Sequence, residues 1–172
     1  MVIRNARGRT KTDVATKTIK NTRSDRRLHR PDRREARLSL LAAGAERPLV
    51  LVVDDDLDAR TIYSTYLRAM GCDVFTADDG RPAIDKAAEL LPDLIVMDLA
   101  MPRLNGWDAI RRLHESSWTQ LIPIIAVSAV PVSRETAFEA GCDAYLTKPC
   151  EPQVLWSQVR ALLRLPRRVL GG

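Results

Sequence analysis

Short runs of apolar residues alternate along this chain with longer segments whose apolar residues recur at helical spacing. The short runs are rich in Val, Ile and Leu, which is typical of strands that are buried on both faces. Right-handed crossovers between such strands produce a parallel sheet with helices on both sides. The strands that this pattern predicts are residues 49–53, 72–76, 94–97, 122–127 and 144–146.

Capping and turn residues delimit the helices predicted after each strand. Gly71 and Gly141 stand where C-terminal caps are expected, while Pro82 and Pro152 stand in first turns. The sequence therefore predicts one α/β domain of five strand–helix units over residues 48–165. The predicted helices include residues 57–70, 82–91, 107–113, 133–140 and 152–163.

The residues that flank this domain differ from it in charge. Residues 1–47 carry 14 Lys and Arg against 5 Asp and Glu, a charge of +9, whereas residues 48–172 carry 13 against 17, a charge of −4. A segment this basic and this poor in large apolar residues is expected to be mostly disordered, with one short helix over residues 32–43. Binding of nucleic acid by this tail through charge alone stays open. Residues 166–172 are expected to form a short C-terminal tail.

The cysteines and the apolar runs bear on where the chain resides. Cys72, Cys142 and Cys150 are too few and too scattered for a disulfide framework or a zinc site, so reduced thiols are expected. Cys150, beside Lys148, is expected to be a small buried or half-buried residue rather than a reactive thiolate. No apolar run approaches the length of a membrane span. A cytoplasmic protein is therefore expected.

Polar residues follow or end four of the predicted strands. Asp54 and Asp55 follow the first strand, Asp98 the third, Ser128 the fourth, and Lys148 closely follows the fifth. In an open parallel sheet these strand ends share one edge, which is the edge where ligands bind. Carboxylates crowded there repel one another, and a hard divalent cation such as Mg²⁺ is the usual remedy. Considered alone, Asp98 fits the capping of a turn equally well.

The same set of residues suits phosphoryl transfer. Once a cation and Lys148 are present, the charge of the site can accept a dianionic phosphoryl group. Asp98 is the candidate nucleophile because it is the single carboxylate at its strand end, whereas Asp54 and Asp55 form a pair suited to holding metal.

Four pieces of the sequence carry a resemblance to a known family: VLVVDDD at 50–56, MDLAMPRLNG at 97–106, Ser128-Ala129, and Tyr145 with Lys148-Pro149. Together they resemble the signature of the receiver domain of bacterial two-component response regulators, of the stand-alone type that includes chemotaxis regulators. The resemblance covers residues 48–165 and implies a flavodoxin-like (βα)5 fold, doubly wound, with strand order 2-1-3-4-5. It also implies transfer of a phosphoryl group from phosphohistidine to an aspartate.

The resemblance implies a role for each acidic position. Asp98 would be the phosphoacceptor, and Asp55 would bind Mg²⁺ directly. Asp54 would bind the ion mainly through water, and Ala100 would contribute its backbone carbonyl. These residues, together with Asp98, are the expected metal ligands.

Further roles concern the phosphoryl group itself. Lys148, the hydroxyl of Ser128 and the backbone N–H of Ala129 would bind its oxygens, with Ser128 and Tyr145 acting as the switch. The peptide bond from Lys148 to Pro149 is expected to be cis, although few X-Pro bonds are.

The resemblance also concerns hydrolysis. Ala100 and Val130 occupy the positions at which this family orients the attacking water, and neither side chain forms hydrogen bonds. Self-dephosphorylation is therefore expected to be slow.

The implied partners are a histidine kinase or histidine phosphotransfer protein upstream and a protein target downstream. Only seven residues follow the domain, so no dedicated DNA-binding domain is expected, and signalling by protein contact is favoured over a transcription factor. Whether phosphorylation drives dimerisation stays open.

A phosphohydrolase of the haloacid dehalogenase type is the competing enzyme class. Its motif, D-x-D-x-T/V after the first strand, is matched by Asp54 and Asp56 but not by Asp58 at the fifth position. That reading also leaves Asp98 and Lys148 unexplained.

Overall fold

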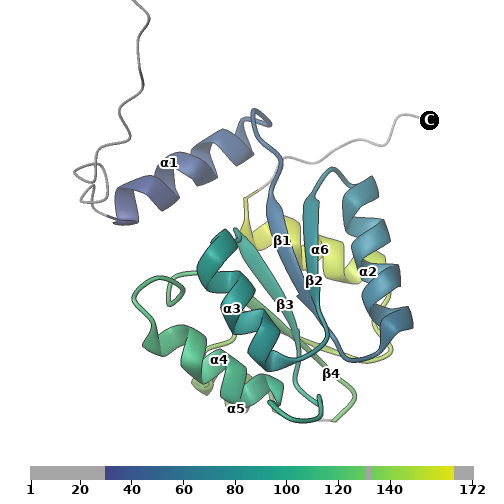
Figure 1. Ribbon diagram of the computed structural model, residues 1–172. Helices are drawn as coiled ribbons and strands as arrows, with labels where there is room; N and C mark the ends of the chain where they lie inside the picture. The colour runs from purple at the N-terminus through teal and green to yellow at the C-terminus, as the bar shows by residue number, and fades with distance from the viewer. Residues whose placement is uncertain (1–29, 131–132, 165–172) are drawn as a thin grey trace, which may run out of the picture.

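The computed structural model describes residues 30–130 and 133–164. Strands and helices alternate along this part of the chain, as the apolar pattern predicts (Figure 1). The elements are α1 Arg30–Ala42, β1 Leu49–Val53, α2 Leu57–Ala69, β2 Asp73–Ala77, α3 Gly80–Leu90, β3 Leu94–Asp98, α4 Gly106–Glu115, β4 Ile124–Ser128, α5 Arg134–Glu139, β5 Ala144–Thr147 and α6 Pro152–Leu162.

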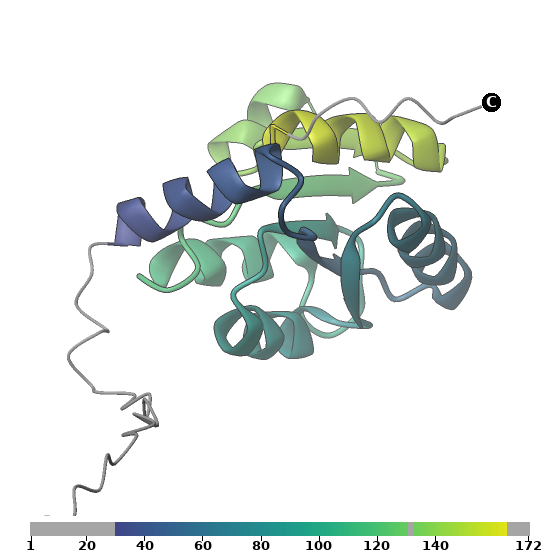
Figure 2. The same cartoon turned by 90° about the horizontal axis from the view of Figure 1, so that it is seen from above.

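The strands form one five-stranded sheet in the order β2-β1-β3-β4-β5, and every neighbouring pair is parallel. The doubly wound sheet and its strand order are thereby confirmed. Successive residues of β1 enter different cores, because side chains alternate across a strand. Leu51 and Val53 pack with residues of α3, α4 and α5, whereas Val50 and Val52 pack with residues of α2 and α6. The helices therefore cover the sheet on both sides, as Figure 2 also shows.

Strand ends differ slightly from the predicted ranges. The fourth strand begins at Ile124 rather than at Ile122, because Pro123 has no N–H to donate to the sheet. Asp98 and Ser128 are the last residues of β3 and β4 rather than the residues that follow them. Both side chains are therefore held at the carboxyl edge of the sheet by the strand itself.

Side chains cap helices α2, α3 and α4, which leave this edge. Asp56 accepts hydrogen bonds from two backbone N–H groups at the start of α2, and Asp79 accepts one from Arg81 at the start of α3. Asn105 accepts one from Asp108 at the start of α4. Such caps fix the short loops between strand and helix.

The helix α1 packs at the opposite edge, where β1 begins (Figure 1). Leu41 is 1% exposed, and Leu38 packs against the core cluster that contains Leu163. The guanidinium of Arg37 donates to both carboxylate oxygens of Asp93, over 2.5 and 2.9 Å. The helix overlaps the one expected at residues 32–43.

The two tails fall mostly outside the described residues. The basic tail is described only from residue 30, and residues 166–172 are not among those described. The division of the chain at residue 47 stays a prediction. Among the described residues, none of the helices is long and apolar enough to cross a membrane.

Candidate functional site

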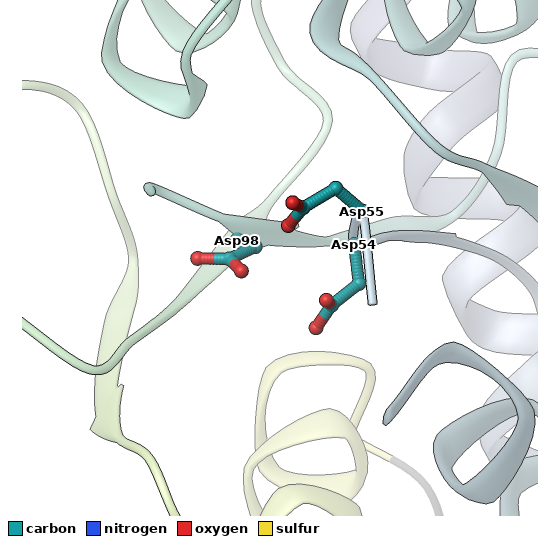
Figure 3. A group of neighbouring side chains, drawn as sticks. All are labelled: Asp54, Asp55 and Asp98. Carbon is teal, nitrogen blue, oxygen red and sulfur yellow. The ribbon is translucent and has the colours of Figure 1, made fainter. Parts of the chain in front are cut away.

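The carboxylates predicted to meet at the sheet edge do so. Asp54 and Asp55 follow β1 directly, and Asp98 ends the neighbouring strand β3. One oxygen from each of the three carboxylates lies within 4.8 Å of the other two. Figure 3 shows the three side chains gathered at the ends of these strands. The parallel topology creates this cluster, because it brings together residues that are 43 or more positions apart.

The two buried carboxylates are held in similar ways. Asp54 is 2% exposed, and its Oδ1 accepts a hydrogen bond from the backbone N–H of Asp56 at 3.0 Å. Asp98 is 3% exposed, and its Oδ1 accepts one from the N–H of Ala100 at 2.9 Å. In both residues the local turn occupies one oxygen and leaves Oδ2 for the centre of the site. Asp55, by contrast, is exposed.

Lys148 pairs with both of these Oδ2 atoms. Its Nζ lies 2.8 Å from Oδ2 of Asp54 and 2.5 Å from Oδ2 of Asp98. Burial opposes the charge of the ammonium, but the hydrogen bonds to the two carboxylates raise the pKa of Lys148 above its ordinary 10.5. Lys148 is therefore a fixed positive charge in contact with the candidate nucleophile.

The site keeps an excess of negative charge. Burial, with the neighbouring charge of Asp98, raises the pKa of Asp54 above its ordinary 3.8 despite the opposing effects of Lys148 and the local N–H. Of the three clustered carboxylates, Asp54 and Asp98 share the ammonium of Lys148, and Asp55 adds a further negative charge. Clustered oxygen donors with excess negative charge suit a small hard cation such as Mg²⁺. The donors present thus fit the predicted ion.

The hydroxyl residue and the aromatic residue lie on the adjoining strands β4 and β5. Ser128 is buried, and its Oγ accepts a hydrogen bond from the N–H of Val130, while its backbone carbonyl accepts one from the N–H of Lys148. The hydroxyl of Tyr145 donates to the carbonyl of Val130 at 2.9 Å, and the ring is buried. Ala129, which lies between Ser128 and Val130 in the sequence, is exposed. Ser128 and Tyr145 are therefore joined through the loop that follows β4.

The peptide bond from Lys148 to Pro149 is cis, which confirms that prediction. Cys150 is half-buried, as expected. Burial raises the pKa of the Cys150 thiol above its ordinary 9.0, so the neighbouring Lys148 does not activate it.

Sequence reasoning missed the contribution of Arg60, on the first turns of α2. Its Nη1 donates to the backbone carbonyl of Asp54 at 2.5 Å and to that of Asp55 at 3.3 Å. These contacts tie the loop that carries two of the acidic residues to the helix that follows. A basic residue five or six positions after an acidic pair at a helix start is the signal that could have indicated it.

Comparison with known proteins shows which family this chain resembles. Residues 50–160 match the family model described as the response regulator receiver domain. The regulator RpaA of Synechocystis, described as a DNA-binding dual master transcriptional regulator, is 36% identical over 124 residues, which are 71% of this chain and 52% of RpaA. PhoP of Bacillus subtilis, the alkaline phosphatase synthesis transcriptional regulatory protein, is 35% identical over 115 residues, which are 67% of this chain and 48% of PhoP. The chain thus spans about half the length of these relatives.

Solved structures match the same part of the chain. The chemotaxis response regulator CheY4 of Vibrio cholerae superimposes with a TM-score of 0.64 at 28% identity, covering 68% of this chain and 99% of CheY4. The receiver domain of a sensor histidine kinase from Pseudomonas aeruginosa superimposes with a TM-score of 0.64 at 27% identity, covering 69% of this chain and 99% of that domain. That structure has a magnesium ion coordinated in its active-site cleft. On the family match and the sheet topology together, this chain belongs to the family of response regulator receiver domains.

Proposed function

We propose that this chain accepts a phosphoryl group on Asp98 from the phosphohistidine of a histidine kinase or a histidine phosphotransfer protein. The signal then passes to a downstream protein through contacts that depend on phosphorylation. The observation that carries this proposal is the cluster of three carboxylates at the carboxyl edge of the sheet, two of which pair with Lys148. Membership of the receiver family supports it.

In the proposed transfer, Oδ2 of Asp98 attacks phosphorus. A P–O bond forms while the P–N bond of phosphohistidine breaks, and the electron pair of the broken bond stays on the imidazole nitrogen. The hydrogen bond from the N–H of Ala100 to Oδ1 orients the carboxylate for this attack. Lys148, already in contact with Oδ2, can pair with the oxygens of the transferred group.

The proposed ligands of Mg²⁺ are the side chains of Asp54, Asp55 and Asp98 and the backbone carbonyl of Ala100. The ion, when bound, would neutralise carboxylate charge and stabilise negative charge on the phosphoryl oxygens. Asp55 is exposed and makes no ion pair with Lys148, which suits a direct ligand. Asp54 already pairs with Lys148, which suits a contact made mainly through water.

The proposed switch involves Ser128 and Tyr145. The hydroxyl of Ser128 and the N–H of Ala129 would move toward the phosphoryl group and shift the loop that follows β4. Tyr145 would respond, because its hydroxyl donates to the carbonyl of Val130 in that loop. The surface formed by α5, β5 and α6 would then change, and this is the surface that we propose for the downstream target.

We expect the chain to catalyse its own phosphorylation from small donors but to dephosphorylate slowly. The side chains at Ala100 and Val130 are exposed beside the site, and neither can donate or accept a hydrogen bond. Neither side chain can therefore orient a water for attack on phosphorus.

The phosphohydrolase alternative gains no support from the site. Asp56, the second residue that matches the hydrolase motif, accepts hydrogen bonds on its carboxylate from the N–H groups of Asp58 and Ala59 and caps α2. It is thus occupied with the helix start. Nucleic-acid binding through the basic tail likewise rests on residues that lie largely outside those described.

The test is phosphorylation by phosphoramidate, whose P–N bond mimics that of phosphohistidine. We expect one phosphoryl group per chain in the presence of Mg²⁺ and almost none when EDTA removes the ion. Release of free phosphate with no accumulation of the phosphorylated protein would favour the hydrolase reading instead.

A further inference from the structure

Asp79 is a buried carboxylate that the proposed mechanism does not use. Its side chain is 4% exposed, and it lies in the turn between β2 and α3, where its Oδ1 caps α3 by accepting the N–H of Arg81 at 2.9 Å. Capping a helix requires only one oxygen of a carboxylate. The second oxygen accepts a hydrogen bond from Nε of Arg103 at 3.2 Å.

The N–H of Arg81, chiefly, and the charge of Arg103 keep the pKa of the Asp79 carboxyl below its ordinary 3.8. The turn that carries Asp79 also contacts the loop between β3 and α4 through the backbone, where the carbonyl of Leu104 accepts the N–H of Gly80 at 3.2 Å. A Cβ on Gly80 would lie 2.6 Å from that carbonyl oxygen, so only glycine permits this approach.

The loop held by Asp79 is the one that follows Asp98. It contains Ala100, the proposed source of a carbonyl ligand, and returns to the sheet where the N–H of Gly106 donates to the carbonyl of Leu99 at 3.2 Å. Arg103 has a φ of +61°, a left-handed conformation that costs energy for a residue other than glycine. A loop that keeps this conformation needs contacts that hold it, and Asp79 supplies them.

We infer that Asp79 is a positioning residue for the metal site, clamping the loop between β3 and α4 so that the carbonyl of Ala100 and the carboxylate of Asp98 are held ready for the cation. This inference rests on the proposed function. Contacts that orient metal ligands from outside commonly change metal affinity by about 10- to 100-fold when they are removed.

The primary test compares Asp79→Asn with Asp93→Asn by calorimetric titration with Mg²⁺. Asparagine at 79 keeps an oxygen to cap α3 but replaces the second acceptor with a donor, so the clamp is lost. Asp93 is the matched control, because its side chain is only 7% exposed and also pairs with an arginine and a backbone N–H, but at the opposite edge of the sheet. We expect Asp79→Asn to weaken Mg²⁺ binding about tenfold and Asp93→Asn to leave it unchanged.

A second variant separates the clamp from a simple effect of charge. Arg103→Glu places a like charge beside Asp79 while keeping the same backbone strain, and Arg103 is 72% exposed, so the fold should tolerate the change. Charge alone predicts tighter Mg²⁺ binding, because the variant adds negative charge near the site. Loss of the clamp predicts weaker binding, by about threefold or more. Should Asp79→Asn fail to fold, this variant decides alone.

The outcomes distinguish the clamp from the proposed function. If the wild type does not bind Mg²⁺, the proposed function fails. If the wild type binds Mg²⁺ while Asp79→Asn and Arg103→Glu bind it as tightly or more tightly, the inference about Asp79 is wrong and the proposed function stands. Weakened binding by Asp93→Asn to the same degree would also overturn the inference, because the effect would then follow general destabilisation.

Discussion

Aspartates lie at both edges of the sheet, in very different surroundings. At the edge where strands begin, Asp93 accepts hydrogen bonds from two nitrogens of Arg37 and from the N–H of Leu49, and Asp143 accepts the N–H of Ile124. At the edge where strands end, three carboxylates lie together, and only two of them pair with Lys148. The first edge matches each aspartate with its own donors, whereas the second leaves negative charge unmatched.

The difference shows that residue type does not decide what a buried aspartate does. A carboxylate whose oxygens are satisfied by arginine and backbone N–H groups has nothing left to offer a ligand, so its role is to hold α1 and β1 in place. Carboxylates that share too few donors stay available to a cation and to a phosphoryl group.

The largest expected effect is a loss of Mg²⁺ binding at the carboxyl edge of the sheet. Asp55→Ala should abolish measurable Mg²⁺ binding, because it removes an exposed carboxylate proposed as a direct ligand. Asp54→Ala should weaken binding less, because Asp54 is already paired with Lys148. Calorimetric titration of the two variants measures both effects. Equal losses would contradict the proposal that Asp55 binds the ion directly and Asp54 mainly through water.

The next effect concerns hydrolysis at the same edge. The double variant Ala100→Asn with Val130→Glu would add side chains that can orient water, so we expect loss of phosphoaspartate to accelerate by about tenfold to a hundredfold. Decay is followed after removal of the phosphodonor. If the double variant decays no faster than the wild type, the argument from water positioning is wrong.

A smaller effect is a loss of stability at the opposite edge of the sheet, where the strands begin. Asp93→Asn should lower the free energy of unfolding by about 1–3 kcal/mol, because Arg37 and the N–H of Leu49 lose a charged acceptor. Urea unfolding measures this loss. An unchanged free energy of unfolding would mean that the contact between α1 and the sheet edge does not stabilise the fold. Asp93 would then not have the structural role assigned to it.

The smallest effect is a dependence on pH. The pKa of Asp79 is lowered, chiefly by the N–H of Arg81. The carboxyl group of Asp79 is therefore less protonated in the folded chain than in the unfolded chain at the same pH. Its contribution to stability is therefore present above pH 3.8 and is lost as the pH falls through the lower, folded pKa. The difference in melting temperature between the wild type and Asp79→Asn should thus shrink on acidification below 3.8. A difference that grows there would contradict the assignment.

The sequence predicts the sheet and the site edge well, for identifiable reasons. Apolar runs that end on Asp98 and near Lys148 locate the strand ends directly, and parallel topology then brings those residues together. The start of β4 was predicted two residues too early, because the apolar run continues through Ile122 and Pro123 while hydrogen bonding does not.

Contacts that depend on tertiary arrangement could not be predicted. Arg37 and Asp93 are 56 residues apart, and Arg103 and Asp79 are 24 apart, and neither pair has a recognisable spacing. Arg60 was missed because a basic residue on an exposed helix turn most often faces solvent. The movement of Ser128 and Tyr145 on phosphorylation stays a prediction.

The central claim is that Asp98, and not any other aspartate, receives the phosphoryl group. The most direct measurement is intact mass spectrometry after incubation with an acyl phosphate and Mg²⁺, on the wild type, Asp98→Asn and Asp93→Asn. We predict the mass increment of one phosphoryl group in the wild type and in Asp93→Asn, and none in Asp98→Asn. A full increment in Asp98→Asn, or none in the wild type, would contradict the account.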